Sequence, residues 1–263
     1  MNEVAMKMTE TQQETIVEVD GVAMRYEGGV QALKGVDLKI PSGELTSFLG
    51  PSGCGKTTLL KIIAGLLTPT EGEVRIRGKK VTGPGPDRAF VFQDFALMPW
   101  ATVQRNVEFG LELRNVPKDV RAQKATQYIA EVGLAGFEKS YPHELSGGMR
   151  QRVGLARALA VEADILMMDE PFASVDEQTR RKFQEDLLEL LAKQKKTVIF
   201  VTHSIEEAVY VSDQVVLLSP RPGKVQRIIR TEINRDKSPD DIRRDKNYLD
   251  YVDDIWAVLR TYL

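Results

Sequence analysis

The sequence predicts an α/β protein with a parallel core sheet, and two observations lead to this fold class. First, several short runs are mostly apolar, which is typical of parallel strands buried on both faces. These runs are Thr46–Leu49, Ala89–Phe92, Ile165–Met168, Thr197–Thr202 and Val215–Leu218. Second, helical patterns such as Lys56–Leu67 and Glu177–Lys193 separate several of the runs. Strands and helices that alternate in this way indicate a parallel sheet covered by helices.

A small antiparallel sheet is expected beside this core, mainly from the N-terminal part of the chain. Ile16–Tyr26, Val36–Ile40 and Gly72–Val81 alternate between apolar and polar residues. A period of two residues is typical of strands that have one exposed face. These three segments therefore predict a β-subdomain next to the parallel sheet.

A helical segment interrupts the α/β pattern at about residues 100–155. Between Trp100 and about Leu145 no strand pattern occurs, whereas Thr102–Leu113 and Lys118–Val132 have helical periodicity. Pro117 precedes the second helix, and proline is favoured at helix starts. The segment is expected to be a helical subdomain inserted in the α/β core.

The C-terminal residues 226–263 form a charged extension to a domain predicted over residues 16–225. The run Arg230–Lys246 alternates basic and acidic residues and is interpreted as a solvated surface. An amphipathic helix is expected at about Tyr248–Leu263. The apolar residues expected to share one face of this helix are Val252, Ile255, Trp256 and Leu259.

Composition argues against several classes of protein. The chain is 42% hydrophobic and 28% charged, with a net charge of −2, so no basic excess indicates a nucleic-acid partner. One cysteine, Cys54, and two histidines, His143 and His203, argue against a disulfide framework and a zinc site. No apolar run approaches the ~18 residues of a spanning helix, and residues 1–15 lack an apolar signal core. Any role at a membrane is therefore expected to be peripheral, through a partner that spans it.

A glycine-rich loop follows the run Thr46–Leu49 and opens the helix that begins at Lys56. Its residues are Gly50, Pro51, Ser52, Gly53, Cys54, Gly55, Lys56 and Thr57. This is the phosphate-loop pattern in the required strand–loop–helix context, where backbone N–H groups and a helix N-terminus surround phosphates. Lys56 is expected to neutralise phosphate oxygens, Thr57 to bind Mg²⁺, and Thr58 to reach a more distal phosphate.

Cys54 lies inside this loop, where a helix N-terminus can lower the pKa of a thiol and make it reactive. The alternative is that the loop only needs a small residue there, and we favour that alternative.

Two acidic residues, Asp169 and Glu170, follow the apolar run Ile165–Met168. A strand that ends beside the phosphate loop can present Asp169 to Mg²⁺ and Glu170 to the attacking water. Phosphoryl transfer needs such positioning and charge neutralisation above all. The alternative is a core strand followed by a solvated turn.

A second glycine-containing helix start occurs at Leu145–Arg152, with the sequence LSGGMRQR. Ser146 is a favourable N-cap, and Gly147 and Gly148 follow it, so this helix start is a second candidate anion site. One nucleotide does not need two such sites in one chain. The alternative is an ordinary capped helix.

LSGGMRQR resembles the signature motif of ABC ATPases, and the resemblance covers about residues 16–220. It implies an ABC-type nucleotide-binding fold in which Ser146, Gly147 and Gly148 close over ATP bound to the other copy of a pair. Gln93 is similar to the Q-loop glutamine that contacts Mg²⁺ and water, and His203 to the switch histidine. Ser174-Val175-Asp176 is similar to the D-loop, although the family more often has Leu at the middle position. Tyr26 is similar to the aromatic residue that stacks on adenine.

The resemblance implies ATP and Mg²⁺ as cofactors, and Glu170, His203 and Gln93 as the catalytic residues. The expected partners are a second ABC ATPase subunit, identical or paralogous, and integral membrane permease subunits, with an extracytoplasmic solute-binding protein acting indirectly. The expected location is the cytoplasmic face of the cell membrane, with no nucleic-acid partner. Gln93–Trp100 and Leu218–Gly223 resemble most closely the importers of nitrate, sulfonate, taurine or bicarbonate.

Four large apolar side chains follow Gln93 closely: Phe95, Leu97, Met98 and Trp100. In the family this region receives a short cytoplasmic helix of the membrane subunit, and an apolar surface suits such a partner. The alternative is that the four side chains pack inside the helical subdomain.

Three other functions are alternatives to an import ATPase. A soluble ABC ATPase acting on DNA or ribosomes usually has tandem cassettes or a long coiled coil, and this chain shows neither. An exporter often fuses the cassette to a membrane domain. A cassette without activity is disfavoured because Lys56, Asp169, Glu170 and His203 are all present. The sequence does not identify the solute.

Overall fold

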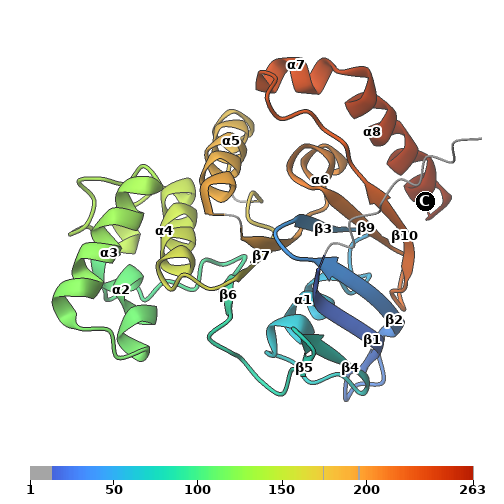
Figure 1. Ribbon diagram of the computed structural model, residues 1–263, viewed down its shortest axis with the longest axis horizontal. Helices are drawn as coiled ribbons and strands as arrows, with labels where there is room; N and C mark the ends of the chain where they lie inside the picture. Colours follow the sequence, from blue (N-terminus) through green and yellow to red (C-terminus); the bar gives the residue numbers. More distant parts are fainter. Residues whose placement is uncertain (1–13, 174, 195, 263) are drawn as a thin grey trace, which may run out of the picture.

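A six-stranded sheet forms the centre of the computed structural model, which describes residues 14–173, 175–194 and 196–262 (Figure 1). Across the sheet the order is β10 (Val225–Arg230), β9 (Gln214–Leu218), β3 (Leu45–Leu49), β8 (Thr197–Val201), β7 (Ile165–Asp169) and β6 (Arg88–Val91). Neighbours from β9 to β6 are parallel, and β10 is antiparallel to β9. All residues of β7, β8 and β9 are buried, as the apolar runs predicted.

The second sheet is antiparallel and has the order β2 (Gln31–Pro41), β1 (Thr15–Arg25), β4 (Glu71–Ile76) and β5 (Lys79–Lys80). It confirms the predicted β-subdomain, with one difference. The segment 72–81 was predicted as one strand, but it is a hairpin. Arg77 and Gly78 both have positive φ, and this turns the chain between β4 and β5.

Helices cover both faces of the six-stranded sheet. Helix α1 (Lys56–Ala64) lies between the two sheets, and its apolar residues share one hydrophobic cluster with both. Helices α5 (Glu177–Gln194) and α6 (Ile205–Val211) belong to the cluster on the opposite face. Successive side chains of a strand point to opposite faces of the sheet. In β3, Phe48 accordingly belongs to the cluster that contains α1, and Leu49 to the cluster that contains α5 and α6.

The inserted helices lie together at one side of the core (Figure 1). They are α2 (Val103–Leu113), α3 (Lys118–Glu131), the short 3₁₀ turn η1 (Pro142–Glu144) and α4 (Gly147–Ala160). Their apolar residues continue the cluster that contains α5 and α6, so the helical subdomain packs against the sheet through α4. The fold class expected from the sequence is confirmed.

The residues after β10 form α7 (Pro239–Arg244), α8 (Lys246–Leu259) and the 3₁₀ turn η2 (Arg260–Tyr262). Helix α8 packs on α6, with Tyr248 and Ile255 buried. Of the residues predicted to share the apolar face, Val252 and Leu259 pack partly against the core, whereas Trp256 is 43% exposed. The run Arg230–Lys246 is not wholly solvated either, since Ile242 is buried and Arg243 stacks over the ring of Tyr210 at 4.2 Å.

In the described ranges, no helix combines the length and apolar character needed to cross a membrane. The parallel strands all end at the same edge of the sheet. The loops that follow β3, β8, β7 and β6 therefore lie side by side, and such an edge is where open α/β sheets bind ligands.

Candidate nucleotide-binding site

The loop Gly50–Thr57 connects β3 to α1 and has the geometry of a phosphate-binding loop. Gly53 and Gly55 have φ values of 72° and 105°, in the region that favours glycine. A β-carbon at Gly55 would lie 2.7 Å from Leu33 Cδ2 and 2.9 Å from Ala32 O, so a side chain does not fit there. The glycines thus let the backbone curl at the N-terminus of α1, where its N–H groups attract anions.

Lys56 crosses the inside of this loop. Its Nζ donates to Gly50 O at 2.7 Å and to Pro51 O at 3.1 Å, and the residue is only 6% exposed. The ammonium group is therefore fixed at the centre of the loop. The Lys56 side chain would therefore need little rearrangement to contact a phosphate held by the loop.

Thr57 and Asp169 meet between α1 and the end of β7. Thr57 Oγ1 donates to Asp169 Oδ1 at 2.7 Å, and Asp169 is 4% exposed. Burial raises the pKa of the Asp169 carboxyl, although the hydrogen bond from Thr57 and the charges of Lys61 and Lys56 act in the opposite direction. A hydroxyl and a carboxylate beside a phosphate site are the oxygen ligands that Mg²⁺ takes when it binds together with phosphates.

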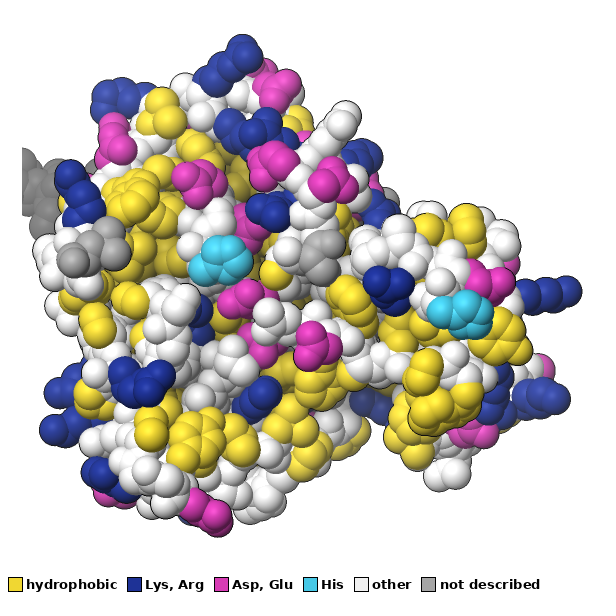
Figure 2. Space-filling view, turned by 180° about the vertical axis from the view of Figure 1, so that it is seen from behind, with side chains coloured by type: hydrophobic (Ala, Val, Ile, Leu, Met, Phe, Trp, Pro, Cys, Tyr) yellow, Lys and Arg dark blue, Asp and Glu magenta, His cyan; other side chains and the backbone are white. Residues whose placement is uncertain are grey.

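The side chains of Gln93 and His203 both approach one carboxylate oxygen of Glu170. The three residues lie at the ends of the neighbouring strands β6, β8 and β7. Gln93 Nε2 donates to Glu170 Oε2 at 3.5 Å, and His203 Nδ1 lies 3.5 Å from the same oxygen. Figure 2 shows acidic side chains next to a histidine, in the middle of the molecular surface seen in that view. The arrangement can hold a water molecule and accept its proton at Glu170 Oε2.

The backbone of Glu170 is strained, because its φ of 47° lies in the left-handed region that non-glycine residues rarely adopt. Its N–H donates to Val201 O at 3.1 Å, which fixes the turn to the end of β8. Such strain costs on the order of 1–3 kcal/mol and is concentrated at functional sites. In this conformation the Glu170 carboxylate lies next to Gln93 and His203, in the loops that follow β6 and β8.

Tyr26 stands on the opposite side of the phosphate loop, at the end of β1. Its Oη lies 3.0 Å from Thr58 Oγ1, and its ring is 40% exposed. The ring borders a cavity of about 320 Å³. The other residues of this cavity are Val30, Ala32, Ser52, Gly53, Gly55, Lys56, Thr57, Thr58, Glu170 and Arg221. An aromatic wall next to a phosphate loop suits a base on one side and phosphates on the other.

Ser146, Gly147 and Gly148 do not border this cavity. Ser146 caps α4, and its Oγ accepts the N–H of Met149 at 3.2 Å. Asp176 also caps a helix, since its Oδ1 accepts the N–H of Thr179 at 3.1 Å, and this bond lowers the pKa of the carboxyl. Ser174, next to it in the predicted D-loop, lies outside the described residues. Both helix starts are thus preformed, yet separate from the cavity that holds the phosphate loop.

Two features of the site were not predicted, the positions of Arg221 and of Thr202. Arg221 reaches the cavity from the turn after β9. Thr202 Oγ1, next to His203, donates to the buried carboxylate of Glu207, whose pKa burial raises. The thiol of Cys54 is buried and its pKa is raised by burial, so a reactive thiol is not supported. The approach of Arg221 to the phosphate loop depends on packing between distant segments.

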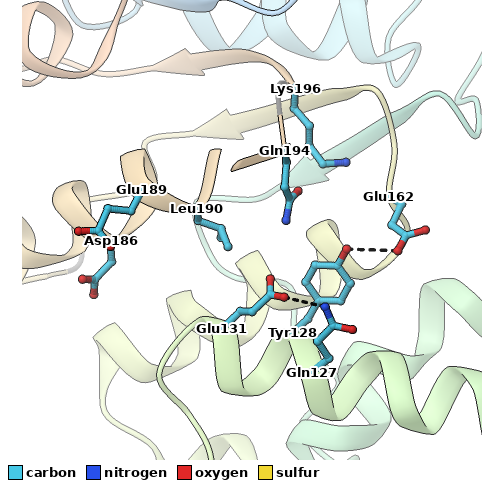
Figure 3. Close-up of a pocket in the computed structure, with 9 residues that line it drawn as sticks. All are labelled: Gln127, Tyr128, Glu131, Glu162, Asp186, Glu189, Leu190, Gln194 and Lys196. Atoms are coloured by element: carbon cyan, nitrogen blue, oxygen red, sulfur yellow. Dashed lines mark hydrogen bonds between the residues drawn. The ribbon is translucent and has the colours of Figure 1, made fainter. Parts of the chain in front are cut away.

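A larger cavity of about 600 Å³ lies elsewhere, between α3, α5 and the loops around Glu162 and Lys196 (Figure 3). Four carboxylates border it, from Glu131, Glu162, Asp186 and Glu189. Tyr128 donates to Glu162 Oε1 at 3.3 Å, and burial raises the pKa of its hydroxyl to about 12. An acidic wall repels phosphate groups, so this cavity is not the nucleotide site.

Comparison with known proteins agrees with this geometry. The family model described as ABC transporter matches residues 33–173. An uncharacterized ABC transporter ATP-binding protein of Methanocaldococcus jannaschii is 51% identical over 88% of this chain and 85% of its own length. The nitrate import ATP-binding protein NrtD of Synechocystis is 42% identical, over 93% and 94% of the two chains. The taurine import ATP-binding protein TauB of Chromobacterium violaceum is 49% identical, over 82% and 83%.

A solved structure of an ATP-binding cassette, a dimer in a post-hydrolysis state with ADP and phosphate, superposes with a TM-score of 0.73. It is 35% identical in sequence and covers 82% of this chain and 98% of its own. Fold and site together define a phosphate-loop nucleotide-binding protein. The chain belongs to the ABC transporter family, as an ATP-binding subunit with ATPase activity.

The burial of Asp169 leads to a prediction about stability. A carboxyl whose pKa is raised by folding destabilises the folded state above that pKa, and the penalty disappears below its unfolded-state pKa of about 4. Asp169→Asn keeps an acceptor for Thr57 but removes the charge. We expect a free energy of unfolding at pH 7 that is about 1 kcal/mol higher without nucleotide, together with loss of ATP hydrolysis.

Thermal denaturation between pH 4 and pH 8 measures the first effect, and the gain should shrink as pH falls toward 4. Asp253→Asn, at an exposed position on α8, is the matched control and should change neither property. A variant that is less stable than the parent at pH 8 would contradict the prediction.

Proposed function

We propose that the described cavity binds ATP and that its hydrolysis energises import of a small solute through membrane-spanning partners. Lys56 and the backbone N–H groups of the phosphate loop bind the phosphates. Glu170 accepts the proton of the attacking water, which Gln93 and His203 orient. Bound Mg²⁺ would neutralise phosphate charge, and the oxygens of Thr57, Asp169 and Gln93 are suited to hold it.

The helix start at Ser146 acts, in this proposal, on the nucleotide of a second cassette. Its separation from the cavity of its own chain and the dimeric assembly of the similar solved structure support this view. The backbone N–H groups of Gly147 and Gly148 would face the terminal phosphate of the partner's ATP. The partner cassette is an identical or a paralogous chain.

The proposed solute is a small anion such as nitrate or taurine, because proteins with these import roles are 42–49% identical to this chain. The chain would lie at the cytoplasmic face of the membrane beneath permease subunits, and a solute-binding protein would act indirectly. The match of Gln93–Trp100 and Leu218–Gly223 to that branch supports the same assignment.

The observation that supports coupling best is the hydrogen-bonded segment 95–98, which lies in the sequence between Gln93 and the exposed Trp100. Arg157 of α4 donates to Phe95 O and Ala96 O, both at 2.7 Å. Phe95 and Ala96 have positive φ, so this half-buried guanidinium holds a strained turn. Asn106 of α2, fully buried, then binds both the N–H and the carbonyl of Met98.

Trp100 follows this segment and is 77% exposed. Leu97 instead packs partly against the helical core, so the two alternatives weighed for this segment apply to different residues. A partner helix that docks at Trp100 would therefore move Gln93 through a rigid loop. An exposed aromatic side chain of this kind is typical of interaction surfaces.

A transport measurement tests this proposal. In Trp100→Asp, we expect solute uptake in reconstituted vesicles to fall by roughly tenfold or more, since loss of one central aromatic contact costs 2 kcal/mol or more. ATP binding should stay within about twofold of the parent, because the cavity does not include Trp100.

The chain provides a matched control in Trp256→Asp, at its other tryptophan, which is 43% exposed on α8. That variant should transport normally. Equal uptake by the two variants would reject Trp100 as the docking residue. Uptake with no ATP hydrolysis would reject the proposed function itself.

A further inference from the structure

The turn 219–224, between β9 and β10, is fixed between β2 and the phosphate loop. Gly223 N donates to Ala32 O at 2.8 Å, and Gly223 O accepts from Lys34 N at 3.0 Å. A β-carbon at Gly223 would lie 2.0 Å from Cys54 O, so only glycine lets the turn approach this closely. None of the roles proposed above uses this turn, although its sequence is one of the two stretches that point to the importer branch.

Arg221 projects from this turn onto the phosphate loop. Its Nε donates to Gly53 O at 3.1 Å, and a β-carbon at Gly53 would lie 2.7 Å from Arg221 Nη2. Pro220 and Pro222 flank it and restrict the backbone on both sides. The guanidinium is therefore held at the wall of the 320 Å³ cavity.

The guanidinium keeps donors for a ligand. It has five N–H groups, and within the described part of the chain its hydrogen-bond acceptor is Gly53 O. Arginine binds phosphate oxygens through two parallel N–H groups, and a planar cation beside the loop suits that geometry. The position thus combines a cation, spare donors and a cavity that binds phosphates.

The order of strands shows from which side Arg221 approaches the phosphate loop. The phosphate loop follows β3, Arg221 follows β9 on one side of β3, and Glu170 follows β7 on the other. Arg221 and the hydrolytic group at Glu170 therefore flank the loop from opposite sides. The turn is also hydrogen-bonded to Ala32, which borders the same cavity.

We propose that Arg221 is a nucleotide-binding residue, which contacts the phosphate groups that ATP and ADP have in common. The proposal rests on the proposed ATP site and adds a second cation to it. Lys56 acts from inside the loop, and Arg221 acts from outside it across Gly53. Because Arg221 and Glu170 approach the loop from opposite sides of β3, Arg221 contributes to affinity and not to the rate of the chemical step.

Nucleotide titrations of the purified full-length chain with Mg·ATP and Mg·ADP test the proposal. In Arg221→Ala and Arg221→Gln, we expect the Kd for both nucleotides to rise by the same factor, roughly 3–10-fold, as for the net contribution of one hydrogen bond. Arg221→Lys keeps the charge and should lose at most about half of that effect on the logarithmic scale. The parent's affinity should fall more steeply with added salt than that of Arg221→Gln.

The matched control is Lys224→Ala, which removes an equal charge from an exposed position in the same turn and should leave Kd unchanged. If Arg221→Gln binds like the parent while Arg221→Ala is impaired, Arg221 only holds the loop through Gly53 O, and the proposal is wrong. It is also wrong if only ATP binding is weakened. Lys56→Ala, which should abolish binding in the same assay, tests the ATP site separately, so the two failures can be distinguished.

Discussion

Glu170→Gln should bind ATP and hydrolyse almost none of it. The parent's carboxylate has Oε2 3.5 Å from both Gln93 Nε2 and His203 Nδ1, where it can accept a proton from water. The glutamine amide cannot accept that proton, so we expect hydrolysis to fall by roughly 10²–10⁴-fold. Glutamine has the same size and side-chain branching as glutamate, so we expect it to fit the left-handed backbone of Glu170.

Glu170→Gln should also change the oligomeric state of the chain when ATP is present. If the terminal phosphate joins two cassettes, a variant that retains ATP should accumulate as a dimer, because closure favours the state in which ATP is bound. Phosphate release and light scattering with ATP measure the two effects. Glu177→Gln, an exposed carboxylate at the start of α5, is the matched control and should behave like the parent. Full turnover by purified Glu170→Gln would remove the role assigned to Glu170.

Much of this site could be predicted because its determinants are local. Glycines at the positions that need φ near 72° and 105° appear in the sequence as a spaced pattern between a strand and a helix. Asp169, Glu170 and His203 each follow an apolar run, and parallel strands end at one edge of a sheet. The resemblance assigned Gln93, Glu170 and His203 to one catalytic site, and in the structure Gln93 Nε2 and His203 Nδ1 both lie 3.5 Å from Glu170 Oε2.

Other features could not be predicted because packing between distant segments decides them. Ile255 and Trp256 are adjacent apolar residues in α8, and only the position of α6 determines that Ile255 is buried and Trp256 exposed. Arg221 meets Gly53 across 168 positions of sequence, through a turn whose place depends on β2. Arg157 is one of many arginines in the sequence, and only the structure shows that it holds the strained turn at Phe95.

Two inactive variants of this chain should regain activity when they are mixed. Lys56→Ala removes the cation inside the phosphate loop, and Ser146→Arg places a bulky cation at the start of α4. If each nucleotide lies between the phosphate loop of one chain and the α4 start of another, a mixed dimer has one site with both defects and one site with neither. In a symmetric dimer with independent sites, an equal mixture should recover up to about a quarter of parental hydrolysis.

The Ser146→Arg variant needs a stability control, because Ser146 Oγ also caps α4 through Met149 N. Loss of such a cap costs about 1 kcal/mol of folding free energy. Ser238→Arg removes the equivalent cap from α7, where Ser238 Oγ accepts the N–H of Asp241, and α7 is remote from the cavity. That variant should lose similar stability and keep full hydrolysis, which separates the effect on the cap from the effect on ATP.

If the site is shared between two chains, the two variants should differ in ATP binding although both lose hydrolysis. Ser146→Arg leaves the cavity of its own chain intact, so it should bind ATP like the parent and yet hydrolyse none. Lys56→Ala should lose both functions, because Lys56 lies inside the loop. If the mixture stays inactive although mixed dimers are shown to form, either the shared site or the independence of the two sites is wrong. If dilute monomeric Ser146→Arg hydrolyses ATP at the parental rate, the α4 start has no role in catalysis, and ATP closure cannot be what drives the membrane partner.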